Sequence, residues 1–398
     1  MKHKQQIKKA LAGFLACAVI GTNALPAAQQ FSVLSPLSIT ASAASCCSFN
    51  ASTGVLTLSG NVTKSAVQSY AKNASVKKVV CARGTVFPVN SDGLFKDFQY
   101  ATSMDLSNAN TSQVEYMGAM FESCYRLKDL NLSGFNTHKV KNMSLMFFGC
   151  WNLVHLDLSS FYTENCTAMD NMFSSCNKLE TIDMSHFNTR KVRTMNNMFG
   201  GCNKLTTFDI DRFYTGSCDT MSSMFAGCSS LTYLDLRNFS TALVQDMAYM
   251  FAGCNSLKHV ELVSFNTASC AYMNNMFHGC YNLEEIEFLH WDTSNVIDMH
   301  NMFTDCRSLT YLDLYRISNT AKVKNMDQMF YDCTNLKTIR ANTRFTTANV
   351  TSADRMFYGC SKLKGKNGTT PASVNYNSLT DSRKYARIDK PGQPGFFS

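Results

Sequence analysis

The sequence predicts an α/β solenoid, and two observations carry this prediction. First, the pair Met-Phe recurs at a spacing of 26 residues up to Met302 (146 − 120 = 26 for the first two copies) and of 27 residues for the last two steps (356 − 329 = 27). The copies begin at Met120, Met146, Met172, Met198, Met224, Met250, Met276, Met302, Met329 and Met356. A repeat of this length is typical of solenoids. Second, each unit combines apolar residues three or four positions apart with others two positions apart, the spacings of a helix and of a strand. We expect about 11–12 coils with a curved, parallel strand face, helices behind it, and a cap at each end.

The unit that follows Thr137 shows the elements expected in every coil. Its first apolar residues recur at steps of three and four and predict a helix of about ten residues: Val140, Met143, Met146 with Phe147, and Cys150. Its next apolar residues end in an alternation that predicts a short strand: Leu153, Leu156 and Leu158. Phe161 then turns the chain, and Thr163 stands where an N-cap would precede the next helix.

This order of strand, turn and helix is the plan of leucine-rich repeats. The motif M-F-x-x-C-x-x-L-x-x-L-D-L-S-x-F-N-T-x-x-V-x-x-M resembles the 26-residue repeat of BspA-like leucine-rich-repeat proteins of bacterial surfaces, over about residues 94 to 363. The resemblance implies a surface or released protein that contacts host matrix, other cells or glycans. Phe135, Phe161 and Phe187 stand where such repeats often carry Asn, so we expect a stack of rings at this turn.

Residues 1–44 are interpreted as a secretion signal. Four lysines precede the apolar run Ala10 to Ile20, which is too short for a comfortable membrane span. Cleavage is expected at Ala41-Ser42-Ala43, with a second possible site near Pro26; an uncleaved anchor and a lipoprotein at Cys17 are weaker alternatives. The protein is therefore expected to be secreted or at the cell surface. Without this segment the net charge of +8 falls by four lysines to +4, and the remaining basic residues are scattered, which argues against nucleic-acid binding.

Three further segments are expected after the signal. Residues 45–93 form an N-terminal cap with a β-hairpin, a short helix and a first strand. Residues 94–363 hold the repeats, and residues 364–398 fold over the last coil as a C-terminal cap or tail. No L-P-x-T-G sorting motif follows, so covalent attachment to a cell wall is unsupported.

Cysteine occupies one position in ten units: Cys124, Cys150, Cys176, Cys202, Cys228, Cys254, Cys280, Cys306, Cys333 and Cys360. A second set, Cys166, Cys218 and Cys270, alternates with valine, which favours small buried apolar groups. Side chains in one column point the same way, so free thiols are favoured over disulfides and over a metal site. Outside the column, Cys46, Cys47 and Cys81 are better disulfide candidates. The threonine column that includes Thr137 and Thr163 is expected to cap the helices.

The outward positions of the strands carry the candidate ligand-binding face. An acidic column runs along it, and aromatic and apolar residues join it in the C-terminal half. The candidate residues are Asp157, Asp183, Asp209, Asp235, Glu261, Glu287, Asp313, Tyr233, Leu289, Tyr311 and Tyr315. The acidic column has two interpretations: a solvated face that blocks aggregation, or a surface for a basic partner, with Ca²⁺ only weakly held.

No enzyme is expected. The H-E-x-x-H, G-x-S-x-G and phosphate-loop motifs are absent from the sequence. The histidine pairs His155/His259 and His186/His290 are each four repeats apart, hence ~20 Å, too far to share a proton or a metal. We expect a monomeric binding or adhesion protein without a cofactor, a metal or, in the mature chain, a transmembrane span, and with an extracellular protein as its ligand. The alternatives are glycan binding through Trp151, Tyr281 and Trp291, or a structural or decoy role without a defined ligand.

Overall fold

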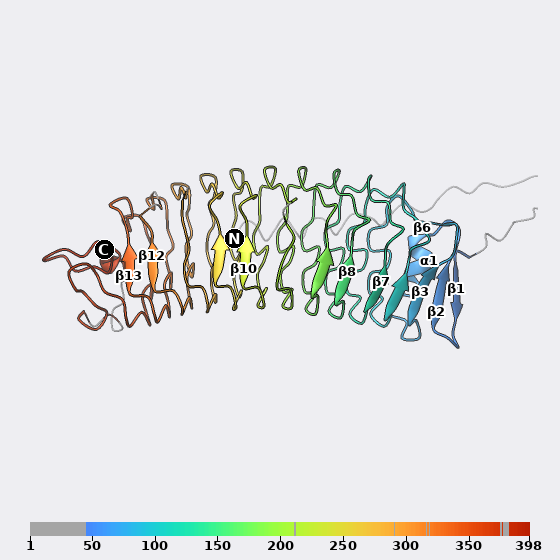
Figure 1. The fold of residues 1–398 in the computed structure, drawn as a ribbon, viewed down its shortest axis with the longest axis horizontal. Coiled ribbons are helices and arrows are strands. Elements are labelled where there is room, and N and C mark those ends of the chain that lie inside the picture. Colours follow the sequence, from blue (N-terminus) through green and yellow to red (C-terminus); the bar gives the residue numbers. More distant parts are fainter. Residues whose placement is uncertain are drawn as a thin grey trace, which may run out of the picture. The chain divides into compact units, whose positions relative to one another are not determined.

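Each repeat forms one coil of a β-solenoid of about 11 coils, and the coils follow one another in chain order along the unit Ser45–Ser398 (Figure 1). The computed structural model describes residues 45–210, 212–289, 291–315, 317, 319–374, 376 and 382–398. The secretion signal expected over residues 1–44 and the expected role of His290 lie outside these residues.

The regular elements of the described chain are short. They are β1 (Cys47–Asn50), β2 (Val55–Leu58), α1 (Lys64–Gln68), β3 (Lys78–Cys81), β4 (Thr85–Val86), β5 (Ser103–Asp105), β6 (Ala109–Asn110), β7 (Asp129–Asn131), β8 (His155–Asp157), β9 (Thr181–Asp183), β10 (Tyr233–Asp235), β11 (His259–Glu261), β12 (Tyr311–Asp313), β13 (Thr338–Arg340) and the 3₁₀ turn η2 (Arg383–Tyr385). From β5 onward, each strand of the strand face belongs to a different coil, and equivalent strands are separated by whole repeats.

From β2 onward the strands pair in parallel and in the register that the repeat predicts. β2, β3, β5 and β7 continue one sheet, and later coils pair as β8 with β9, β10 with β11, and β12 with β13. Leu156 lies opposite Ile182, and Leu234 opposite Val260, so equivalent residues of neighbouring units are adjacent. The coils of Asp209 and Glu287 carry no assigned strand in the described residues, so the strand face consists of several short sheets.

The prediction of a helix in every coil is wrong. The segment that begins at Met143 forms consecutive turns: Met146 N–H donates to Met143 O (3.2 Å), and Cys150 N–H donates to Phe147 O (3.1 Å). Alternate amides of the segment donate to the next coil instead: Leu145 N–H donates to Asp170 O (2.8 Å), and Phe147 N–H donates to Met172 O (2.8 Å). In a helix those amides would bond within their own segment and could not link coils.

The backbone of these turns explains why the spacing of the apolar residues was misleading. Leu145 (φ 61°) and Gly149 (φ 73°) have left-handed conformations that interrupt any helix, and equivalent residues of other coils share them. Consecutive turns of three to four residues bring one apolar side chain inward per turn, which is also the periodicity of a helix face. A parallel ladder of single β-bridges, from Asn90 to Ser352, links this side of the coils.

The core is a set of side-chain columns. Phe95 and the phenylalanines of the ten Met-Phe pairs stack from coil to coil with ring centroids 5.3–6.0 Å apart. The stack consists of Phe95, Phe121, Phe147, Phe173, Phe199, Phe225, Phe251, Phe277, Phe303, Phe330 and Phe357. The ring stack predicted at the turn that follows each strand is confirmed at two pairs. The ring centroids are 6.0 Å apart in Phe135–Phe161 and 6.2 Å apart in Phe187–Phe213. Such contacts bury large apolar areas between neighbouring coils.

The threonine column does not cap helices, because turns follow it in the described residues. Thr163 is fully buried; its hydroxyl donates to Asn188 O (3.0 Å) and accepts the Asn188 N–H (2.8 Å) in the next coil. Thr241 makes the same two contacts with Asn266. The column therefore satisfies buried backbone groups between coils, which are costly to leave unpaired.

The cysteines of the described chain are present as thiols, and all but Cys46 are buried. In the main column each thiol donates to a phenylalanine carbonyl of the preceding coil, as Cys150 does to Phe121 O (3.2 Å). Burial raises the pKa of Cys254 to about 12, and it also raises the pKa of Cys150 well above its usual value. The disulfide candidates Cys46 and Cys47 have Sγ atoms 3.8 Å apart, and Cys81 is also a thiol.

The two ends of the unit differ from the coils. At the N-terminus β1 and β2 form an antiparallel pair, and the Thr63 hydroxyl accepts the Ala66 N–H at the start of α1. At the C-terminus the Tyr376 hydroxyl accepts the Phe357 N–H (2.9 Å). In the preceding coil the equivalent amide, Phe330 N–H, donates to a carbonyl of the next coil. Phe397 forms a bridge with Ile339. The segment boundaries expected from the sequence remain predictions.

Candidate functional site

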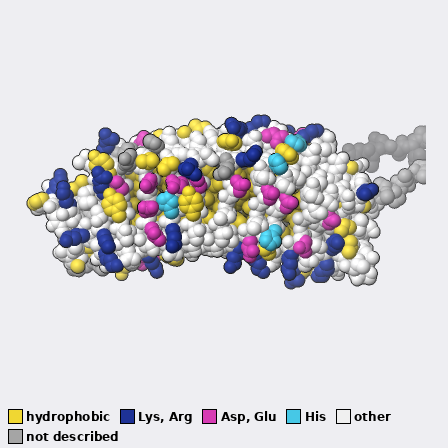
Figure 2. Space-filling model, in the orientation of Figure 1, with side chains coloured by type: hydrophobic (Ala, Val, Ile, Leu, Met, Phe, Trp, Pro, Cys, Tyr) yellow, Lys and Arg dark blue, Asp and Glu magenta, His cyan; other side chains and the backbone are white. Residues whose placement is uncertain are grey.

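The acidic column lies on the strand face, at the last position of successive strands. Asp157 lies opposite Asp183, Asp235 opposite Glu261, and Asp313 opposite Arg340. On the face shown in Figure 2, acidic and hydrophobic side chains gather over the coils of the C-terminal half. The acidic residues of these strands thus share the last strand position, whereas Tyr233 and Tyr311 share the first.

Part of this column has a structural role. Ser159 N–H donates to Asp157 Oδ1 and Ser185 N–H to Asp183 Oδ1, each at 2.9 Å. Hydrogen bonds from Ser159 hold the pKa of Asp157 below its usual range. Such side-chain contacts to the backbone two residues on are typical of turns. They relieve the repulsion between neighbouring carboxylates without any ligand.

Basic side chains contact other members of the column. Arg237 binds Asp235 through two nitrogens (shortest contact 2.5 Å), and hydrogen bonding to Arg237 lowers the pKa of Asp235. Arg340 contacts Asp313 at 3.1 Å. His259 lies between two carboxylates, with Nε2 3.0 Å from Glu261 and Nδ1 3.4 Å from Glu285, and its ring stacks on Tyr233 at 5.9 Å.

A hollow of about 320 Å³ brings four of the predicted residues together. Ile286 and Phe288, both buried, line it with Glu285 and the predicted residues Glu287, Leu289, Tyr311 and Asp313. Leu289 and Tyr311 are exposed (37% and 46%), and so is Tyr315 (50%), whose ring lies under Arg340. Within the described residues Glu287 has no hydrogen-bonding or ionic partner, which distinguishes it from Asp235, Glu261 and Asp313. Asp157 and Asp183 lie several coils away from this hollow.

The sequence reasoning missed a larger hollow, of about 1000 Å³, over the N-terminal strands. Its lining includes the side chains of Lys78, Lys128 and Lys178 above the apolar Met104 and Leu130. It lies where β7 ends the first sheet and β8 begins another. Alignment with the repeat places these lysines in alternate coils beside the strand face, but the break between the sheets has no signal in the sequence.

The aromatic residues proposed for glycan binding are not equivalent. Trp291 is 1% exposed and packs between Phe265 and Phe288 in the core, so its assignment as an exposed sugar-stacking residue is wrong. Trp291 occupies the repeat position of the inward phenylalanines such as Phe265. This position in the repeat is the signal in the sequence that predicts its burial. Trp151 and Tyr281 are exposed, but they lie outside the strands, against Tyr125 and Arg307 respectively.

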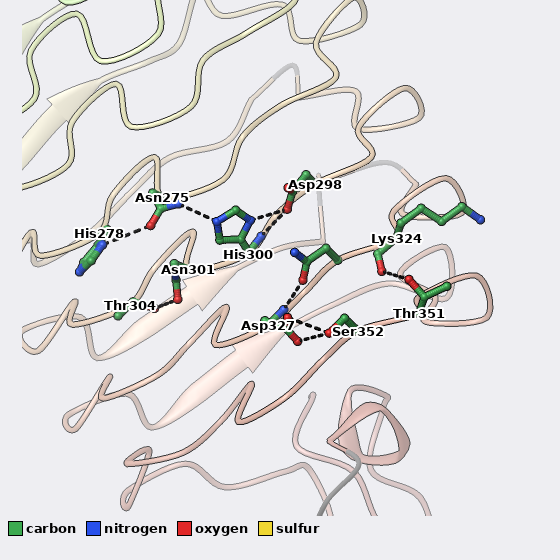
Figure 3. Close-up of polar contacts among 11 residues, drawn as sticks. Asn275, His278, Asp298, His300, Asn301, Thr304, Lys324, Asp327, Thr351 and Ser352 are labelled. Carbon is green, nitrogen blue, oxygen red and sulfur yellow. Dashed lines mark hydrogen bonds and ion pairs between the residues drawn. The ribbon is translucent and has the colours of Figure 1, made fainter. Parts of the chain in front are cut away.

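Histidines also contribute contacts on the turn side of the coils (Figure 3). His300 Nδ1 lies 2.8 Å from Asp298 Oδ1, and His300 Nε2 lies 3.0 Å from Asn275 Nδ2. Asn275 Oδ1 in turn is 3.2 Å from His278 Nδ1. The chain of contacts links neighbouring coils. In the described part of the protein, no group of three His, Cys, Asp or Glu side chains converges as metal ligands would.

These features define a repeat protein, a β-solenoid whose outward columns line its surface. The chain belongs to the family described as "Mycoplasma protein of unknown function, DUF285", whose model matches residues 90–207, 175–285 and 254–370. No curated protein matches it. Among the described residues no helix has the length and apolar character needed to cross a bilayer.

Several solved structures are similar at low identity. A leucine-rich cell surface protein of Faecalibacterium prausnitzii is 15% identical, with 77% of this chain and 96% of that chain covered and a TM-score of 0.37. The pneumococcal vaccine antigen PcpA is 17% identical, with 71% and 68% covered and a TM-score of 0.39. A leucine-rich-repeat protein of Eubacterium ventriosum is 14% identical, with 81% and 96% covered and a TM-score of 0.32.

Proposed function

We propose that the chain is a secreted or surface binding protein that recognises an extracellular protein through its strand face, without chemistry on the ligand. The observation that carries this proposal is the hollow at Glu287, Leu289 and Tyr311. It combines an apolar base, exposed aromatic and aliphatic side chains, and a carboxylate without a partner in the described residues. Aromatic anchors at an apolar pocket are typical of protein interfaces.

The charge of this region favours a basic segment of the partner. Glu285 and Glu287 are both exposed, and only Glu285 has a basic neighbour, His259 at 3.4 Å, among the residues that the structure describes. An incoming Lys or Arg side chain could place its apolar stem on Leu289 and Tyr311 and its charge at Glu287. The expected secretion signal and the resemblance to BspA-like proteins support the extracellular location in this proposal.

The test is a binding screen of the chain against immobilised extracellular matrix proteins. The variant Tyr311→Ala/Glu287→Lys should lose at least tenfold in affinity for any captured protein, because it removes an anchor and reverses the free charge. Tyr249→Ala/Glu180→Lys is the control, since Tyr249 is similarly exposed (41%), Glu180 is exposed, and neither residue lines the hollow or belongs to the candidate binding residues. Equal losses in both variants would contradict the proposal.

Salt dependence separates this proposal from glycan recognition by the exposed tyrosines. Binding of a basic segment should weaken strongly as salt rises, because the charges are exposed. Binding that depends on Tyr311 but not on salt, with a positive glycan array, would instead indicate a glycan ligand. If matrix and glycan screens both gave no binding, the structural or decoy role would be favoured.

A further inference from the structure

The turn edge of two coils carries the same basic sequence pattern. His138-Lys139-Val140-Lys141 and Arg190-Lys191-Val192-Arg193 occupy equivalent positions, because their offset, 190 − 138 = 52, is twice the length of one repeat. Val140 and Val192 are fully buried, whereas the basic side chains around them are exposed. Two coils correspond to roughly 10 Å along the stack. We refer to His138, Lys139, Lys141, Arg190, Lys191 and Arg193 as the basic edge.

Carboxylates contact only half of the side chains of the basic edge directly. Glu115 binds Lys141 (2.7 Å), Asp219 binds Arg193 (2.6 Å), and Glu164 lies 2.7 Å from His138. The other three side chains meet neutral groups. Lys139 donates to Gln113 Oε1 (2.6 Å), Lys191 donates to Asn165 Oδ1 (2.7 Å), and the Arg190 guanidinium lies 3.9 Å from the centre of the Tyr214 ring.

These neutral contacts position the cations and leave their charge available to a ligand. Aromatic surface lies beside them. The Tyr162 ring is stacked between His138 (4.4 Å) and His186 (4.9 Å), and it is 38% exposed. Figure 2 shows basic, histidine and acidic side chains side by side along one edge of the N-terminal half. The basic edge therefore offers two groups of cations, two coils apart, with exposed ring edges between them.

We propose that the basic edge binds a linear sulfated polysaccharide. Two clusters separated by about two coils fit anionic groups that recur once per disaccharide, and the rings between them fit the apolar faces of sugars. A nucleic acid fits less well, because its phosphates recur every ~3.4 Å per strand and would meet the Glu164 carboxylate in the intervening coil. This site is independent of the proposed strand-face function.

The test measures binding of the full chain to immobilised heparin. Lys139→Gln/Lys191→Gln should weaken binding about tenfold and reduce its salt dependence, because two cations that no carboxylate contacts directly are lost. The matched control is Lys322→Gln/Lys362→Gln. These lysines also donate to asparagine oxygens of the preceding coil, Asn295 (2.6 Å) and Asn335 (2.5 Å), but lie outside the basic edge. The control should bind heparin as the parent does.

Three outcomes would overturn the proposal: equal losses in the two double variants, binding of unsulfated hyaluronan as tight as that of heparin, or binding of duplex DNA tighter than that of heparin. The strand-face variant Tyr311→Ala/Glu287→Lys should retain heparin binding. Since it should also lose the protein ligand, failure at one surface can be distinguished from failure at the other.

Discussion

The hydroxyl of Thr137 holds both backbone polar groups of one residue in the next coil: it donates to Tyr162 O (2.9 Å) and accepts the Tyr162 N–H (2.8 Å). Thr137 is fully buried. The same arrangement recurs along the column, so a side chain expected to start a helix instead links coils. Threonine suits this position because its one hydroxyl can donate and accept together.

Thr137→Val should therefore destabilise the protein by about 1–3 kcal/mol, because it keeps the shape of the side chain but leaves two backbone groups of Tyr162 unpaired. Denaturant unfolding measures this change. Thr167→Val is the control, since Thr167 is exposed and its hydroxyl makes one contact, to Lys141 O (3.1 Å). A loss at Thr137 no larger than at Thr167 would contradict the assigned role.

The buried thiols should make the fold sensitive to alkali. Burial, with smaller contributions from Asp219 and Asp170, raises the pKa of Cys218 from 9.0 to about 12. A thiol whose folded-state pKa is raised contributes stability that is complete below pH 9 and is lost as the pH rises towards 12. The urea midpoint should fall between pH 8 and about 10.5 under reducing conditions.

Valine stands at the equivalent position of the neighbouring coils, at Val192 and Val244, so Cys218→Val is an apt variant. It should unfold at a similar urea concentration at pH 8 and lose less stability than the parent at higher pH. Parallel pH profiles for the two proteins would show that Cys218 does not contribute.

Repetition made much of this fold predictable from the sequence. The constant repeat length predicts which residues are neighbours, and the registers Leu156↔Ile182 and Leu234↔Val260 follow it. The helices were wrong because apolar spacing reports which side chains point inward, and consecutive turns share that spacing with a helix. Left-handed conformations at non-glycine residues such as Leu145 and Tyr249 have no clear signal in one sequence.

The sequence predicts which residues of the candidate site share a column, but it does not predict the hollow between them. The exposure of Tyr233, Tyr311 and Tyr315 follows from alternation along a strand. The hollow beside Tyr311 was not predictable, because it depends on a coil whose described residues form no regular strand. Trp291 was misplaced because a large aromatic residue suits both a core and a sugar site, and only its register separates the two.

Trp291 offers a test of this core assignment. Its indole N–H is buried and has no partner among the described residues. An unpaired buried donor is costly, and phenylalanine occupies the same column at Phe265, so Trp291→Phe should be as stable as the parent or up to ~1 kcal/mol more stable. A loss above that amount in thermal or denaturant unfolding would show that the indole makes a needed contact.

The C-terminal tail should loosen in acid. Burial raises the pKa of Asp389, but hydrogen bonds from Thr369, Asn367 and Gly395 outweigh it and leave the pKa below its usual value. Stability from such a carboxylate is complete above its unfolded pKa of 3.8 and is lost as the pH falls further. Asp389→Asn should therefore expose the tail to limited proteolysis at neutral pH, with Asp354→Asn, at an exposed residue, as the control. Equal cleavage of both variants would contradict this role.

The strand face and the basic edge both depend on coils that are built from strands and turns. The central claim is therefore that the described repeats contain no helix. Far-ultraviolet circular dichroism of the chain tests it most directly. The account predicts a spectrum of strand and turn without the helical double minimum. A helical content close to that of an ordinary α/β protein would contradict it.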